Sequence, residues 1–466
     1  MLPSTPVMPK GPQKPNKSGH PAAKRRPDTV SPNRAKPSQR ERLLAAMTHV
    51  AGSQGYAELS IADLTSRARV SRQTFYEQFA GKEDLFLAAY RRSARQVLGP
   101  LRGATSAGDW WETPRTVVRE ILARIEADPE GAWLFFVEGL AGGPHIEAER
   151  RRVLEGVEAA IEGFLESAPA GGQTLDVPPR ALLGAIRGAA IRAIAPWQPR
   201  IDAGGQEPTV DEGLLAWIRS YAIPGGQARW SAREHSPALG HGSVAPASPI
   251  LARHERLPPG RHGLPRGVVE RNQRERFILA TAEVIQAKGY AAITVGDIAG
   301  AAGIGKNVFY EYFADKRHIF LVAQQHTLQE TFNACARAYF AQPTWPARIH
   351  AGLRTLCAIV AAEPALAHLR ILAPYTAGPE AIERAQQTAM LFAAFLEEGY
   401  SHRPRAEQMP RACSAAIIDA VFEIIRAEIA AGRAGELSHQ APLLSYIAIA
   451  PFTGAQAAVQ LIEELR

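Results

Sequence analysis

Two stretches of the sequence decide the fold: SIADLTSRARVSRQTFYEQFAGKEDLF, residues 60–86, and TVGDIAGAAGIGKNVFYEYFADKRHIF, residues 294–320. Each begins with a Ser or Thr that can cap a helix, followed three residues later by an Asp that suits the positive end of a helix. A short apolar face, a tight turn and a second helix start, at Ser71 or Gly305, come next. A short helix, a turn and another short helix are typical of a helix-turn-helix unit, so the sequence predicts two such units.

Both stretches belong to a longer internal repeat, which is a sign of duplicated architecture. Residues 40–82 align with residues 274–316 at a constant offset of 234 without a gap, and 16 of the 43 positions are identical. The repetition continues further along the chain, because Pro129 recurs as Pro364 at offset 235. The sequence therefore predicts two copies of one larger unit.

The composition predicts an all-α chain of several domains. The chain has 466 residues, of which 46% are hydrophobic and 21% charged, so most of it can bury a core, and Ala and Leu dominate the folded stretches. Many Gly, Pro and Ser residues between the two copies predict a flexible linker. The expected organisation is a disordered basic tail (1–38), a helix-turn-helix domain (39–92), a helical regulatory domain (93–222), the linker (223–269), a second helix-turn-helix domain (270–326) and a second helical regulatory domain (327–466).

The charge pattern favours a polyanionic partner. The net charge is +7, and residues 1–39, with eight Lys or Arg and one Asp, account for all of it. A basic leader suits DNA, and it equally serves as a solubilising tail. The three cysteines, odd in number and far apart, argue against a disulfide framework and favour a cytoplasmic protein. No apolar run reaches the ~18 residues of a membrane span, so no membrane is expected as a partner.

Catalytic motifs are weak in this sequence. The segment GAAGIGKN, residues 300–307, nearly matches the phosphate-binding loop G-x-x-x-x-G-K-[ST], but Asn307 stands where a Mg²⁺-binding hydroxyl is needed and no strand is expected before it. Neither G-x-S-x-G nor H-E-x-x-H occurs. We therefore expect a protein that is not an enzyme and has no cofactor or metal.

The two stretches resemble the DNA-binding region of TetR-family transcription regulators. A tyrosine, a phenylalanine three residues on and a lysine three residues after that carry the resemblance in each copy: Tyr76, Phe79 and Lys82, then Tyr310, Phe313 and Lys316. The Ala-rich remainder of each half fits the family's helical ligand-binding and dimerisation domain in length only. The resemblance implies a ligand-responsive regulator, a repressor rather than an activator, with double-stranded DNA and a small-molecule effector as partners.

The third helix of each unit, which follows the turn, is the expected recognition helix, and its first turn enters the major groove. The base-facing candidates are Ser71, Arg72, Gln73 and Thr74 in the first copy, and Lys306, Asn307 and Val308 in the second. Arg fits guanine, Gln and Asn fit adenine, and Val fits the thymine methyl group. Because the two sets differ, we expect two different half-sites and an asymmetric operator.

Other residues are expected to hold the DNA backbone. The resemblance implies that Tyr76 and Tyr310 bind phosphate and that Lys82 and Lys316 lie near the backbone. The caps Ser60 and Thr294 would place hydroxyls and helix-end amides on phosphate. Two features depart from the family pattern. Arg69 stands where the family usually has Gly in the turn, and Glu77 and Glu311 put carboxylates into the recognition helices.

Three alternatives stay open. Trp133 and Phe136 are weak candidates for an apolar effector pocket, and ordinary helical core is the other interpretation. The two halves form either an intrachain pseudo-dimer or, between two chains, a homodimer with four DNA-binding units. The third alternative is that one or both helix-turn-helix units no longer bind DNA, which would leave a ligand-binding or protein-interaction module.

Overall fold

The computed structural model describes most of the chain. The described residues are 37–56, 59–102, 111–140, 142–166, 174–195, 210–223, 263–402 and 409–465. The predicted tail, 1–38, lies outside them except for its last two residues, and the predicted linker lies outside them between 224 and 262. The described residues from Gln39 onward belong to one compact unit.

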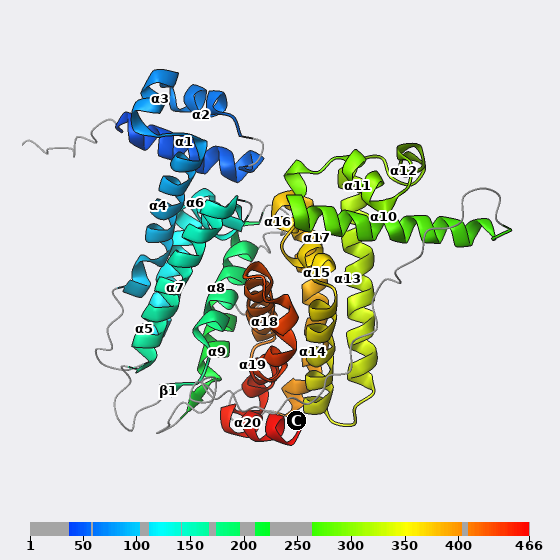
Figure 1. The fold of residues 1–466 in the computed structure, drawn as a ribbon. Helices are drawn as coiled ribbons and strands as arrows, with labels where there is room; N and C mark the ends of the chain where they lie inside the picture. The colour runs from blue at the N-terminus through cyan, green and yellow to red at the C-terminus, as the bar shows by residue number, and fades with distance from the viewer. Residues whose placement is uncertain are drawn as a thin grey trace, which may run out of the picture. The chain divides into compact units, whose positions relative to one another are not determined.

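The first half of this unit is built from helices (Figure 1). They are α1 (Gln39–Gln54), α2 (Ile61–Ala68), α3 (Arg72–Gln78), α4 (Lys82–Arg102), α5 (Glu112–Ala127), α6 (Pro129–Phe136), η1 (Glu138–Leu140), α7 (Pro144–Glu166), α8 (Pro179–Ile194) and α9 (Val210–Arg219). Two short strands, β1 (Thr174–Leu175) and β2 (Ala222–Ile223), pair antiparallel and form the one sheet within the described residues.

The second half is helical throughout its described part. Its elements are α10 (Arg266–Lys288), η2 (Tyr290–Ala292), α11 (Val295–Ala302), α12 (Lys306–Tyr312), α13 (Lys316–Phe340), α14 (Trp345–Ala362), α15 (Pro364–Ile371), α16 (Pro374–Ala377), α17 (Pro379–Leu391), η3 (Phe392–Ser401), α18 (Cys413–Ala430), η4 (Ala434–Gln440), α19 (Ala441–Thr453) and α20 (Ala455–Glu464). Helices α11, α12 and α13 begin 234 residues after α2, α3 and α4, and α15 begins 235 residues after α6. The predicted all-α fold with two tandem copies is confirmed.

Aromatic side chains form the core of each helix-turn-helix unit. Phe75 and Phe79 are buried in the first unit, and Phe309 and Phe313 are buried in the second. In the second unit the ring of Phe277, on α10, meets that of Phe309 edge to face at 5.4 Å. Because the Phe side chains anchor α3 and α12 to the core, the opposite faces of these two helices remain available to solvent.

The turn of the first unit places a large residue in left-handed backbone. Arg69 has φ 52° and ψ 52°, and it is the one residue other than glycine with positive φ among those described. The second unit has Gly303 at the equivalent position, with φ 62° and ψ 33°. A residue with a Cβ costs roughly 1–2 kcal/mol in this conformation, so the first turn is strained where the second is not.

We predict that Arg69→Gly stabilises the chain by about 0.5–1 kcal/mol, because the relief of left-handed strain exceeds the added entropy of the unfolded glycine. Chemical denaturation of the full chain measures the change. Arg67→Gly is the matched control, since Arg67 is exposed in the regular part of α2, where glycine lowers stability by about 1 kcal/mol. Destabilisation by both substitutions would contradict the prediction.

The two halves of the chain pack against each other through α8 and α18, which lie side by side (Figure 1). A Cβ atom on Gly184 would lie 2.9 Å from the carbonyl oxygen of Asp419, so the absence of a side chain lets the helices approach closely. Reciprocal hydrogen bonds reinforce the contact, because Tyr221 donates to the carbonyl of Ile447 at 2.6 Å and Tyr446 lies 2.9 Å from Oδ2 of Asp176.

No single helix in the described ranges is long and apolar enough to cross a bilayer; α14 and α15 pass that test only as a pair, and the pair is bent by 110°. The three cysteines all fall within the described ranges, are buried and form no disulfide. The described part of the chain also holds no group of three metal-ligating side chains.

Candidate nucleic-acid interface and cavity

Helices α2 and α11 begin with matching capping boxes. The Ser60 hydroxyl accepts a hydrogen bond from the Asp63 amide at 3.2 Å, and the Ser60 amide donates to Asp63 Oδ2 at 3.0 Å. Thr294 and Asp297 repeat this arrangement at 3.2 and 2.8 Å. Hydrogen bonds from the side chain and then the backbone of Ser60 lower the pKa of Asp63. Both hydroxyls also lie within hydrogen-bond distance of their Asp Oδ2, so the helix-end amides are the groups best placed for a phosphate.

The first turn of each predicted recognition helix is exposed. Ser71 caps α3 by accepting from the Thr74 amide at 3.0 Å. Arg72 and Gln73 are exposed, and Gln73 donates to Glu77 at 3.0 Å, so this carboxylate holds a neighbouring amide within its own helix. In α12, Lys306 and Asn307 are exposed, and Val308, like its counterpart Thr74, is half-buried. The structure thus brings all seven predicted base-facing residues together, four on the first unit and three on the second.

The two tyrosines of the resemblance are conspicuous exceptions to aromatic burial. Tyr76 and Tyr310 are each 58% exposed. Each ring meets the preceding phenylalanine edge to face, Phe75 at 5.3 Å and Phe309 at 5.4 Å. The packed ring therefore fixes the position of a phenol whose outer part faces solvent, which is the geometry that a phosphate contact requires.

The two lysines of the resemblance, Lys82 and Lys316, contact carbonyl groups of the protein backbone, whereas the sequence analysis expected them near the DNA backbone. Lys82 Nζ donates to the carbonyls of Tyr56 at 3.2 Å and Leu59 at 2.9 Å. Lys316 Nζ lies 3.2–3.4 Å from three carbonyls in the equivalent loop. Lys82 therefore ties the start of α4 to the loop before α2, and Lys316 ties the start of α13 to the loop before α11. Their contact with the DNA backbone stays a prediction.

Arginine side chains that the sequence analysis did not single out support the turn itself. Arg42 donates to the carbonyl of Arg69 at 3.2 Å, and Arg276 donates to the carbonyl of Ala302 at the end of α11. The signal was available, because both arginines end an Arg-Glu-Arg triplet that is identical in the two copies. Each therefore anchors the turn that sets the angle between the two helices.

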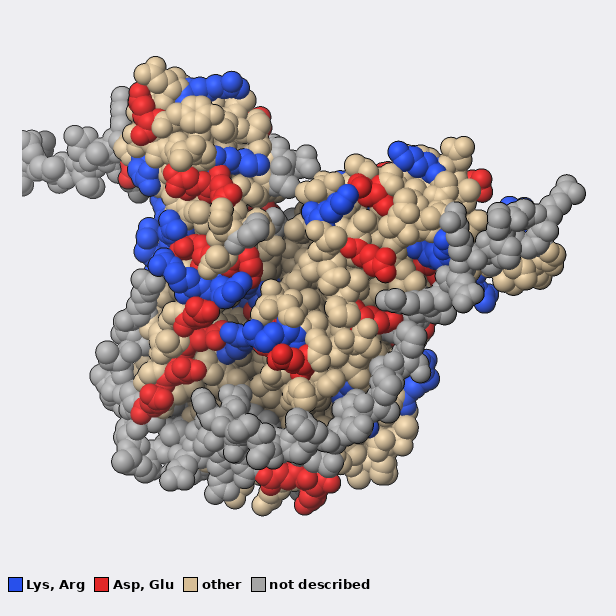
Figure 2. Space-filling view, in the orientation of Figure 1, with Lys and Arg blue, Asp and Glu red and all other residues tan. Residues whose placement is uncertain are grey.

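Acidic and basic side chains are interspersed on the face shown in Figure 2, over α1–α3 as well as over α10–α12. This face of the two units therefore shows no continuous basic surface. Recognition there would depend on individually placed groups rather than on bulk charge.

A buried carboxylate joins the first helix-turn-helix unit to the helices below it. Glu138 is 6% exposed and accepts from the Tyr56 amide at 2.8 Å and from the Trp133 indole at 3.3 Å. Burial raises the pKa of Glu138 to about 7, although these two hydrogen bonds lower it. Trp133, a weak candidate for an effector pocket, therefore has its N–H committed to this junction.

We predict that Glu138→Gln removes a pH dependence of stability. Because the pKa of Glu138 is raised on folding, its contribution is complete below about pH 4.5 and is lost as the pH rises through about 7. As the pH rises from 5 to 8, the free energy of unfolding of the variant should therefore increase by on the order of 2 kcal/mol relative to that of the wild type. Melting temperatures across this range measure the gain. Glu126→Gln, on the exposed face of α5, is the control, and a parallel profile in both variants would refute the prediction.

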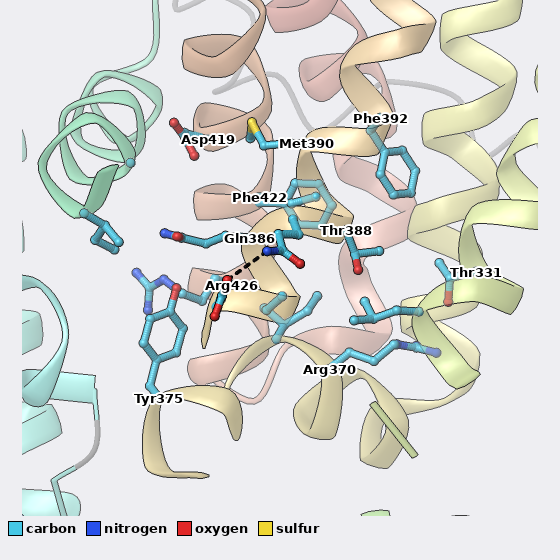
Figure 3. Close-up of a pocket in the computed structure, with 18 of the residues that line it drawn as sticks. Thr331, Arg370, Tyr375, Gln386, Thr388, Met390, Phe392, Asp419, Phe422 and Arg426 are labelled. Carbon is cyan, nitrogen blue, oxygen red and sulfur yellow. Dashed lines mark hydrogen bonds between the residues drawn. The ribbon is translucent and has the colours of Figure 1, made fainter. Parts of the chain in front are cut away.

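A cavity with a volume of about 390 Å³ lies between α8 and the helices of the second half (Figure 3). Its walls are mainly apolar, with arginines among them: Arg187, Arg192, Arg370 and Arg426. Neither Trp133 nor Phe136 lines it, because both are buried within the first half. The sequence analysis did not predict this cavity, although Arg370 in the largely apolar α15 was a visible signal.

Comparison with known proteins agrees with the geometry of the two units. The family model described as bacterial regulatory proteins, tetR family, matches residues 43–89 and 277–323. The HTH-type transcriptional activator FasR of Mycolicibacterium smegmatis is 27% identical over 124 residues, which cover 26% of this chain and 57% of that protein. The HTH-type transcriptional regulator YxbF of Bacillus subtilis is 27% identical over 117 residues, which cover 25% of this chain and 30% of that protein. The chain thus spans only about a third to just over half of these relatives.

The solved structures of similar proteins described next cover 37–38% of the chain. The fatty acid degradation regulator FadR of Bacillus halodurans is 17% identical with a TM-score of 0.34, covering 38% of this chain and 94% of its own. FadR of Bacillus subtilis, solved with stearoyl-CoA, is 16% identical with a TM-score of 0.33, covering 37% and 96%. Together with the repeated exposed helix and its tyrosine, the two family matches show that this chain contains, in tandem, two domains of the tetR family of bacterial regulatory proteins.

Proposed function

We propose that this chain is a sequence-specific DNA-binding transcription regulator that reads two different half-sites with α3 and α12. One observation carries the proposal: the two helix-turn-helix units share the same scaffold residues, whereas their base-facing residues differ. Tyr76 and Tyr310 have equal exposure, whereas Arg72 and Gln73 face solvent where the second unit presents Lys306 and Asn307. Equal phosphate contacts with unequal base contacts favour an asymmetric operator.

The same proposal includes an intrachain pseudo-dimer. Helix α8 of the first half and α18 of the second half bury glycines and charged groups against each other, so one chain supplies both DNA-binding units. A regulator of this kind would act as one chain on two half-sites about 34 Å apart, or a multiple of that distance. A monomeric mass in solution and a footprint of two half-sites support it, whereas a dimer with a footprint of four half-sites supports the homodimer.

Regulation by a small molecule, repression rather than activation, and a cytoplasmic location complete the proposal. The cavity beside α8 supports the first of these, because a bound molecule would contact the helix pair that joins the halves. The sign of regulation is tested with a reporter gene under the selected operator. Repression predicts higher expression when the chain is deleted, and activation predicts lower expression.

The two tyrosines give the sharpest test of DNA binding. Selection of binding sequences from a random pool, followed by a titrated mobility shift, should yield one asymmetric site for the full chain. Tyr76→Phe and Tyr310→Phe keep the ring packing and remove the hydroxyl, and each is expected to weaken binding to matched and mismatched sites by the same factor, roughly tenfold. Arg72→Ala should instead relax preference at one base pair, with a change of about 1–3 kcal/mol.

Two outcomes would overturn this proposal. If no sequence is enriched and no shift is seen at low salt, the chain is better described as a ligand-binding or protein-interaction module. If a tyrosine variant changes base preference instead of overall affinity, the phosphate role of that tyrosine is wrong.

A further inference from the structure

We propose that the cavity beside α8 binds an apolar molecule that carries one carboxylate, and that Arg370 pairs with this group. The inference rests on the proposed function, because it names the chemical class of the effector. The support is geometric and comes from one buried guanidinium, its neighbours, and the residue that takes its place in the first half of the chain.

Arg370 is a buried cation whose two terminal nitrogens lack hydrogen-bond acceptors among the described residues. The residue is 2% exposed and lines the cavity, and neither Nη1 nor Nη2 has a hydrogen-bond acceptor in the described structure. Burial lowers its pKa to about 10, partly offset by the charge of Glu363. A buried charge without a partner costs several kcal/mol, and a bound anion would remove that cost.

The other arginines of the cavity already have carboxylates. Arg192 pairs with Asp419, and Glu423 takes both Arg187, at 2.8 Å, and Arg426. One further donor remains at the cavity, because Nη1 of Arg426 also lacks a protein acceptor among the described residues. Arg370 is therefore the one arginine of the described lining with no carboxylate at ion-pair distance, which favours a ligand that carries a carboxylate.

The first half of the chain shows that the fold does not need an arginine at this position. Helices α6 and α15 have equal lengths and an offset of 235, which makes Phe135 the counterpart of Arg370. Phe135 is 4% exposed and packs on Tyr90 at 5.4 Å. Likewise Val97, buried in α4, is the counterpart of the cavity residue Thr331, at offset 234. Polar groups thus replace an apolar core in the second copy alone.

The rest of the cavity suits an apolar body. Its walls include Leu356, Val360, Ile371, Met390, Phe392 and Phe422. Figure 3 shows Phe392 and Phe422 at this site together with Arg370 and Thr331. An apolar pocket with few polar groups that fix orientation is typical of small-molecule sites, and its volume is in the range of such sites. A wholly polar anion would bury no apolar surface against these walls, so the walls favour a ligand with an apolar body.

Helix α15 connects the site to DNA binding. Leu366 and Leu369 on the same helix belong to the core of the second helix-turn-helix unit. Arg370, the next residue, lines the cavity. A ligand that binds Arg370 would therefore contact α15, a helix that packs directly against α10 of the second helix-turn-helix unit.

Titration calorimetry with the full chain, without DNA, tests the proposal. The probes are two acids of different shape, decanoate and 4-phenylbutyrate, and their alcohols, 1-decanol and 4-phenylbutan-1-ol. At least one acid should bind at least tenfold more tightly than its alcohol. Arg370→Met should weaken that acid by tenfold or more and leave its alcohol unchanged, and Arg370→Lys should retain the preference for the acid.

Melting of the ligand-free chain gives a second readout. Arg370→Met should melt above the wild type, because it removes an unpaired buried charge. Arg354→Met, exposed on α14, is the control and should match the wild type in both assays. The proposal is overturned if neither acid binds, if alcohols bind as tightly as acids, or if Arg370→Met leaves acid binding intact or lowers the melting temperature. These outcomes are distinct from a failure of the proposed function, which the mobility shift alone reveals.

Discussion

Glu423→Gln is expected to lower the free energy of unfolding by about 3–5 kcal/mol at pH 7. Glu423, on α18, is 4% exposed and accepts from Arg426 Nε at 2.9 Å, while Arg187 Nε of α8 lies 2.8 Å away. A third guanidinium, that of Arg150, is at 3.9 Å. Arg150 also has Glu147 at 3.4 Å, but neutralising Glu423 would leave Arg187 and Arg426, both buried, without their ion-pair partner.

The pKa of Glu423 gives the pH range of this contribution. Burial raises it, and Arg426 and Arg187 lower it by more, so that it falls to about 2. A carboxyl whose pKa is lowered on folding stabilises the fold fully above its unfolded value of about 4.5, and that stability is lost as the pH falls toward 2. The wild type and the variant should therefore differ most at neutral pH and converge in acid.

Urea denaturation of the full chain measures this loss. Glu398→Gln is the control, because Glu398 pairs with Arg348 at 2.8 Å but is 42% exposed, and an exposed pair contributes only about 0–1 kcal/mol. A loss below 1 kcal/mol for Glu423→Gln, or equal losses in both variants, would show that the cluster does not hold the two halves together.

The helix-turn-helix units were predictable because their signals are local. Ser60 and Thr294 cap the helices that the sequence assigned to them, and α3 and α12 begin at Arg72 and Lys306, next to the predicted starts. The segment 300–307, similar to a phosphate-binding loop, is the end of α11, a turn and the start of α12. The ungapped repeat doubled each signal, since a pattern that occurs twice at one offset is unlikely to be accidental.

The cavity was not predictable in this way, because it depends on contacts between segments far apart in the chain. An aromatic residue gives the same pattern whether it lines a pocket or fills a core. Trp133 is an aromatic candidate for a pocket, but its environment depends on Glu138 and on the loop at Tyr56, 77 residues earlier. Arg370 carried more information, because a charge on an apolar helix needs a physical reason.

A double substitution at the contact between the halves is expected to have an effect of similar size. Gly184 and Gly188 lie one turn apart on α8 and face α18. A Cβ on Gly184 would lie 2.4 Å from Glu423 Cβ, and a Cβ on Gly188 would overlap the carboxylate of Asp419. Gly184→Ala combined with Gly188→Ala should force the helices apart, disturb the ion pairs between them, and lower the free energy of unfolding by about 4 kcal/mol.

The matched control is Gly156→Ala combined with Gly163→Ala on α7, where both glycines are exposed and a Cβ would meet nothing within 4 Å. Alanine is the better helix former by about 1 kcal/mol per site, so this pair should stabilise the chain. The same chemical change therefore has opposite signs on α7 and on α8, and the difference isolates the close approach of the halves from helix propensity. If both double variants were stabilised, α8 and α18 would not be in contact in solution, and the intrachain pseudo-dimer would have to be abandoned in favour of assembly between chains.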